Sequence, residues 1–115
     1  MTNEVTFLIE LVKGADVATW GHILDELEVL LPEAELIPCK LRASRNMYIA
    51  GQCSKEAYEQ AFGAHVEYTR ETIPDLYRGP QVVGNWVEVL PTQIPENFKA
   101  HVRRIELNRK VFLAD

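Results

Sequence analysis

Apolar residues show two different spacing patterns along the first two thirds of the chain. In four segments they run together or alternate with polar residues. This pattern predicts strands at 5–12, 34–41, 47–51 and 65–69. In 17–31 and 54–62 they recur at spacings of three and four, the period of a helix that buries one face. The predicted order is strand, helix, strand, strand, helix, strand.

Residue types that favour helix and strand ends support these boundaries. Asp16 and Ser54 are good N-caps, and Gly63 can take the left-handed conformation that ends a helix. Pro32 stops the first helix because proline cannot continue one. Pro38 lies inside the second predicted strand. Since proline removes a donor from the hydrogen-bond ladder, we expect that strand at an edge of the sheet.

The pattern weakens after the fourth strand. Segment 70–85 is punctuated by prolines and glycines and has no period, so we expect an irregular surface segment there. Segment 85–90 contains Trp86, Val87 and Val89 and predicts a fifth strand.

The last part of the sequence predicts a helix and a tail. Pro95 and Glu96 suit the first turn of a helix. Its inner stripe would consist of Phe98, Val102 and Ile105. Residues 109–115 follow as a C-terminal tail.

These elements predict a single α+β domain spanning residues 1–115. Their order matches the split βαβ, or ferredoxin-like, arrangement: a βαββαβ two-layer sandwich with an extra C-terminal strand and helix. Another two-layer α+β sandwich, with the last helix on the far face, is the alternative. In the ferredoxin-like fold, one core between the sheet and two helices should contain Phe7, Ile9, Leu24, Leu27, Ile49 and Phe62.

Composition narrows the class of protein. The 115 residues, 47% of them hydrophobic, suffice for one buried core. The net charge of −5 argues against nucleic-acid binding, which needs a basic face. No apolar run approaches the roughly 20 residues that span a bilayer, and the N-terminus lacks the basic region of a signal peptide. We therefore expect a cytoplasmic protein without nucleic-acid or membrane contacts.

Chemically versatile residues occur without the spacing that catalysis or metal binding requires. His22, His65 and His101 have no partners at metal-ligand spacing. Cys39 and Cys53 form neither a disulfide framework nor a metal motif. The chain also lacks a nucleophile elbow and a glycine-rich phosphate loop. The sequence predicts no catalytic residue, no metal site and no cofactor, hence no enzyme.

A motif in the middle of the chain resembles a signature of peptidase activation domains. It consists of Tyr48-Ile49-Ala50-Gly51-Gln52, then Tyr58-Glu59-Gln60-Ala61-Phe62-Gly63, with Tyr68 in the strand beyond. In pro-kumamolisin (sedolisin) propeptides a similar glycine-containing turn ends a strand. A short helix closing on alanine-phenylalanine-glycine follows, and then a strand with a tyrosine.

The likeness extends through the proline-marked segment 93–98 to Val102, and so covers roughly residues 47–107. Subtilisin-type propeptides share the general fold. The resemblance therefore implies a ferredoxin-like fold and a serine peptidase as partner. It leaves three forms open: a free-standing propeptide relative, an inhibitor, or a protein that retains only the fold.

The leading hypothesis for function is a non-catalytic protein-binding module that resembles a serine-peptidase propeptide or inhibitor. Trp86 and Tyr77 flank the irregular segment and are candidate partner contacts, with core packing as the alternative for Trp86. In such propeptides the segment after the folded domain lies in the peptidase cleft. The resemblance assigns that role to 111–115, including Phe112, Leu113, Ala114 and Asp115.

Other interpretations remain open. Phe112 and Leu113 can instead fold back as an edge strand or a core patch. The protein can be a structural or assembly subunit that contacts like chains as a homo-oligomer. A small enzyme with a pocket between the sheet and the irregular segment is the third class.

Overall fold

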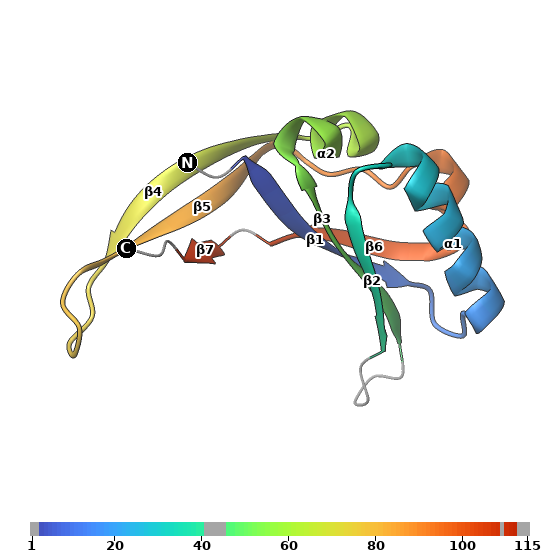
Figure 1. Ribbon diagram of the computed structural model, residues 1–115, viewed down its shortest axis with the longest axis horizontal. Helices are drawn as coiled ribbons and strands as arrows, with labels where there is room; N and C mark the ends of the chain where they lie inside the picture. The colour runs from blue at the N-terminus through green and yellow to red at the C-terminus, as the bar shows by residue number, and fades with distance from the viewer. Residues whose placement is uncertain (1–2, 41–45, 109, 113–115) are drawn as a thin grey trace.

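The computed structural model describes residues 3–40, 46–108 and 110–112, which form two antiparallel sheets and two α-helices (Figure 1). In chain order the elements are β1 (Glu4–Leu11), α1 (Val17–Leu30), β2 (Glu35–Lys40), β3 (Met47–Ser54), α2 (Lys55–Phe62), β4 (His65–Ile73), β5 (Gln81–Leu90), the 3₁₀ turn η1 (Glu96–Phe98), β6 (Val102–Leu107) and β7 (Lys110–Phe112). The fold class is α+β, as the hydrophobic pattern predicts. No helix in these ranges has the length and apolar character needed to cross a membrane.

Sheet A has the strand order β2-β3-β1-β6, and all neighbouring strands are antiparallel. β1 is central, so Ile9 is paired with Ile49 on one side and with Ile105 on the other. β2 lies at an edge of the sheet, as Pro38 predicts, and is paired with β3.

The two helices cover one face of sheet A and enclose the core. The ring of Phe7 on β1 lies 5.5 Å from that of Tyr58 and 5.6 Å from that of Phe62, both on α2. Ile23 and Leu27 bury the inner face of α1 in the same core. The predicted core is confirmed, since the following residues belong to it or pack against it: Phe7, Ile9, Leu24, Leu27, Ile49 and Phe62.

The predicted helix ends are confirmed by their hydrogen bonds. The Asp16 carboxylate accepts the N–H of Thr19 at 2.8 Å, which caps α1. The Ser54 hydroxyl accepts the N–H of Ala57 at 3.1 Å, which caps α2. Gly63 has a φ of 60°, the left-handed conformation that ends α2 and turns the chain into β4.

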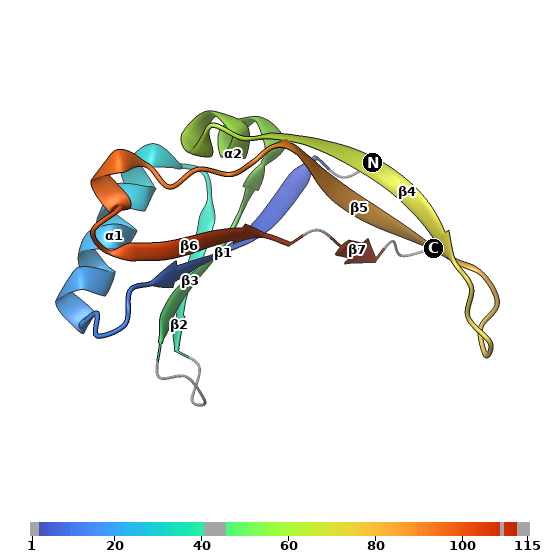
Figure 2. The ribbon, with the colours of Figure 1, turned by 180° about the vertical axis from the view of Figure 1, so that it is seen from behind.

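Sheet B has the order β4-β5-β7 and extends away from the helices (Figure 2). β4 and β5 form a long hairpin over residues 65–90, called here the arm, and residues 74–80 are the arm tip. At the base of the arm, Val66 and Trp86 join the core. The molecule is consequently elongated, with extents of 48 × 32 × 22 Å.

The helix predicted at 95–105 is wrong. The turn η1 ends at Phe98, and β6 then runs along β1. A bulge explains the misleading pattern: Leu11 is paired with Val102 and Glu10 with Arg104, so β6 carries one extra residue. Val102 and Ile105 therefore both face the core although they are three residues apart, which imitates the helical period.

The irregular segment predicted at 70–85 is also wrong. β4 continues to Ile73 and β5 begins at Gln81, so only the arm tip lacks strand structure. β3 similarly passes through Gly51, where the predicted strand ends. The ring of Phe7 occupies the space that a Cβ of residue 51 would need, so glycine there serves packing and not termination.

Part of the predicted tail 109–115 is a strand. The backbone of β7 pairs with β5, with Val111 opposite Gly84 and Phe112 opposite Val83. Of the two interpretations of the tail, residues 110–112 follow the second, in which the segment folds back as an edge strand. Leu113, Ala114 and Asp115 lie outside the described residues.

Candidate functional site

The face of sheet A opposite the helices, called here the helix-free face, forms a groove of about 910 Å³ that continues onto the base of the arm. The face arises from strand alternation, because Phe7 and Ile9 point toward the helices and Thr6 and Leu8 point away. The side chains that line it from sheet A include Thr6, Leu8, Ile37, Ala50, Gln52 and Arg104.

The groove combines an apolar floor with a charged rim. Leu8 and Ala50 are half-buried in the floor, and Ile37 on the edge strand β2 is 62% exposed. Glu35 and Glu106 stand at the rim. An exposed apolar surface rimmed by polar residues is typical of a protein-interaction site.

A buried carboxylate stabilises sheet A near one end of this face. Glu10 is 4% exposed and alternates with the core residues of β1. Its Oε1 lies 3.4 Å from Nη1 of Arg103, and its Oε2 lies 3.1 Å from Nη2 of Arg104. The bulge in β6 brings these two consecutive arginines to one carboxylate. The pairing of one buried anion with two cations connects β1 to β6.

A hydrogen-bond chain connects the groove with the core at the base of the arm. Thr92 Oγ1 donates to the Glu88 carboxylate at 3.2 Å. The hydroxyl of Tyr58, 2.7 Å from Thr92 Oγ1, is therefore the donor of the next bond. Burial raises the pKa of Tyr58 to about 12, against the effect of the Thr92 hydrogen bond and aided by the charge of Glu88. The phenol stays protonated at neutral pH and acts as a fixed contact.

Glu59 on α2 connects the helical layer to the arm. Its carboxylate accepts the Val66 N–H at 2.9 Å and lies 2.6 Å from His65 Nδ1 and 3.6 Å from Lys55 Nζ. Burial alone would raise the pKa of Glu59. The hydrogen bonds from Val66 and His65 and the charge of Lys55 outweigh burial and hold that pKa below its usual value.

The arm buries two polar groups that have no hydrogen-bond partner in the described part of the chain, the hydroxyl of Tyr68 and the indole N–H of Trp86. Their rings pack edge to face, 5.2 Å apart, and Tyr68 lies over Gly84. Trp86 is 1% exposed. Its side chain therefore packs in the core, the alternative interpretation, and presents no surface to a partner.

The arm tip is an ordered turn that presents apolar side chains to solvent. Asp75 Oδ1 accepts the N–H of Tyr77 at 2.8 Å and that of Arg78 at 3.0 Å. Gly79, with a φ of 74°, completes the turn. Leu76 and Tyr77 are 99% and 96% exposed. Tyr77 is a contact candidate from the sequence. Leu76 was not among the candidates from the sequence. The spacing of Asp75 and Gly79 is a turn signal, and it would have indicated a hairpin with Leu76 in its turn.

The three histidines lie apart from the groove. His22 is 3.2 Å from Glu26 and its ring is 6.2 Å from that of His101, whereas His65 contacts Glu59. Within residues 3–40, 46–108 and 110–112, no three or more His, Cys, Asp and Glu side chains are arranged to hold a metal ion. None of the three lines the groove as far as the chain is described.

Cys39 and Cys53 are free thiols, and neither lines the groove. Burial, together with the charge of Glu4, raises the pKa of Cys53 to about 11. The thiol is therefore protonated at neutral pH and is a poor nucleophile. The described side chains that line the groove thus include no thiol.

Comparisons with models of known protein families, with curated proteins and with solved structures found no match in any of the three.

Proposed function

We propose that the protein is a non-catalytic binding module that takes a protein partner on its helix-free face. The observation that carries this proposal is the groove of about 910 Å³, with Ile37 exposed above a floor of Leu8 and Ala50. A surface of this kind supplies apolar contact area, and the carboxylates at its rim supply orientation.

The finer fold assignment belongs to the same proposal. The order β2-β3-β1-β6 with antiparallel neighbours agrees with a ferredoxin-like core in which β6 is the fourth strand. The arm is then an insertion between α2 and that strand. In this arrangement the helix-free face is the side of the sheet that remains available to a partner.

A serine peptidase of the sedolisin or subtilisin type is the partner class that the propeptide-like motif supports. The residues of this motif lie in β3, α2 and β4. Gly51 lies beneath the Phe7 ring, and α2 ends at Phe62 and Gly63. The backbone pairing of β7 with β5 argues for contact through the helix-free face ahead of contact through the tail. A cytoplasmic location is part of the proposal, supported by the two free thiols.

The test is inhibition of one subtilisin-type and one sedolisin-type peptidase by the full chain. We expect inhibition that saturates at one chain per enzyme. Ile37→Asp should abolish it by placing a charge in the apolar groove, whereas Val29→Asp, at an exposed position of α1, should not. Failure of the full chain to bind either enzyme would refute the peptidase as partner.

Association with like chains is the second candidate function. It is favoured by the arm, which projects from the helical layer and ends in two exposed apolar side chains. This candidate requires no peptidase.

A further inference from the structure

We propose that two copies of the chain form a symmetric dimer in which the arm tip of each copy occupies the groove of the other. This inference rests on the second candidate function, association with like chains, and is independent of the peptidase. It joins two features of the described chain: an arm tip with two exposed apolar side chains, and a groove with an apolar floor at the base of the arm.

The tip has the properties of an interaction anchor. The turn around Asp75 fixes the backbone, so Leu76 and Tyr77 are held outward before any contact forms. An ordered turn loses less conformational entropy on binding than a flexible loop. Tyrosine is also among the residues that contribute most to protein interfaces.

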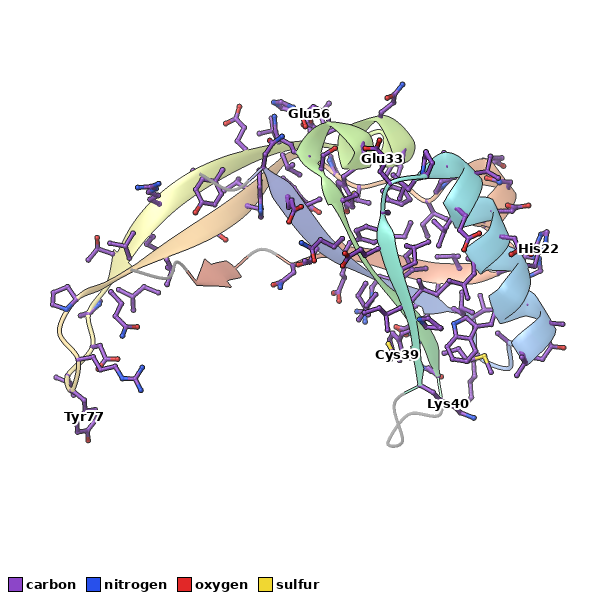
Figure 3. All side chains as sticks on the ribbon, in the orientation of Figure 1. His22, Glu33, Cys39, Lys40, Glu56 and Tyr77 are labelled. Atoms are coloured by element: carbon purple, nitrogen blue, oxygen red, sulfur yellow. The ribbon has the colours of Figure 1, made fainter. Side chains whose placement is uncertain are left out.

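The tip cannot fill the groove of its own chain. Figure 3 shows Tyr77 at the far end of the arm, well separated from Cys39 and Lys40 at the end of β2. The groove begins at the base of the same arm, where Glu88 and Thr92 line it. Only a second molecule can bring an arm tip to this groove.

The position of the two features permits a closed dimer. Each chain carries its groove at the base of the arm and its apolar tip at the end. When two chains lie antiparallel, each tip meets the base of the other arm, and both contacts form together. Such a self-complementary contact is the property of a two-fold dimer, and it leaves no tip or groove for a third chain.

Charge favours the same occupant. The chain is acidic, with a net charge of −5, but its tip carries the exposed Arg78 beside Tyr77. The groove is lined by three carboxylates, those of Glu35, Glu88 and Glu106, and by one cation, Arg104, whose Nη1 lies 3.4 Å from Glu106 Oε1. A tip with two apolar side chains and one cation thus matches a groove with an apolar floor and acidic rim.

The exposed surface of the single chain leaves room for this contact. Its accessible area is 7862 Å², whereas a compact monomer of this mass exposes about 6,400 Å². Its radius of gyration is 15.7 Å, against about 13 Å for a compact chain of this length. The surplus of about 1,500 Å² exceeds the roughly 800 Å² that each partner buries in a standard interface.

Sedimentation equilibrium of the full chain, over a range of concentrations and without peptidase, tests the proposal. We expect a dimer of twice the 13.1 kDa chain mass. A tip variant, Leu76→Asp with Tyr77→Asp, and a groove variant, Ile37→Asp, should each weaken the dimer about a hundredfold or more, because each change occurs at both contacts. Val29→Asp, which alters another exposed apolar side chain outside both features, should leave the dimer intact.

All substituted positions are exposed, so each variant should remain folded and unfold cooperatively on heating, with a lower midpoint than wild type only where the dimer is lost. A monomeric wild-type chain overturns the proposal, as does a dimer that survives either the tip or the groove variant. A monomer that still inhibits a peptidase would keep the proposed function and refute this dimer. A dimer that is weakened by both variants and inhibits no peptidase would support this dimer and refute the peptidase as partner.

Discussion

The helical layer and the arm share one packing arrangement but differ in whether their buried tyrosine hydroxyls are hydrogen-bonded. In each, an aromatic ring lies over a strand glycine: Phe7 over Gly51 in sheet A and Tyr68 over Gly84 in the arm. In the helical layer the hydroxyl of Tyr58 is hydrogen-bonded. In the arm, the hydroxyl of Tyr68 has no hydrogen-bond partner among the described residues. The helical layer is thus complete within one chain, and the arm retains unmet contacts.

The glycine pair should give the largest difference between the two regions. Gly51→Ala should destabilise the protein by about 1–3 kcal/mol, because the new methyl would overlap a Phe7 ring that is fixed in the core. Gly84→Ala should have a smaller effect, since half-buried Tyr68 can turn its ring away. Urea denaturation of both variants measures the difference. Equal losses would show that the arm is packed as rigidly as the core.

The tyrosine pair compares hydrogen bonding directly. Tyr58→Phe should cost about 1 kcal/mol, because it removes a bonded hydroxyl in the helical layer. Tyr68→Phe should be neutral or slightly stabilising, because it removes a buried hydroxyl that has no partner. Thermal unfolding of the two variants provides the measurement. A marked loss for Tyr68→Phe would mean that this hydroxyl is bonded in the assembled protein.

The smallest effect is expected where the two regions meet. Glu59→Gln should destabilise the protein by about 0.5 kcal/mol at neutral pH, since the amide oxygen can still accept the Val66 N–H. The folded state lowers the pKa of Glu59, so its carboxylate stabilises the fold fully above the ordinary value of 4.5. That contribution is lost as the pH falls through the lowered pKa.

The difference in unfolding free energy between wild type and Glu59→Gln should therefore shrink as the pH falls below 4.5. Glu28→Gln, at an exposed position of α1, is the matched control and should show no such trend. A difference that grows as the pH falls below 4.5 would contradict the assigned direction of the pKa shift.

The sequence predicted the helical layer well because its signals are local. Asp16 and Ser54 cap their helices through residues three positions ahead, and Gly63 acts on its own backbone. Strand alternation in β1 and the proline in β2 likewise describe their own segments. Tertiary contacts added to these preferences and did not overrule them.

The arm and β6 were mispredicted because their structure depends on distant partners. Residues 69–72 are exposed polar residues without an apolar period, and they become a strand by pairing with β5. In β6 the bulge opposite Glu10 gave two core residues a helical spacing. The groove depends on β1, β2, β3 and β6 lying side by side, so Ile37 and Arg104 could not be related from the sequence.

The central position of β1 affects the order in which the protein can fold during synthesis. Residues 4–11 pair with 47–54, but their other neighbour, 102–107, is made last among the strands of sheet A. The arm lies between these partners in the chain and closes through the short turn 74–80, so it can pair locally much earlier. The arm can therefore begin to pair during synthesis while one edge of β1 is still open.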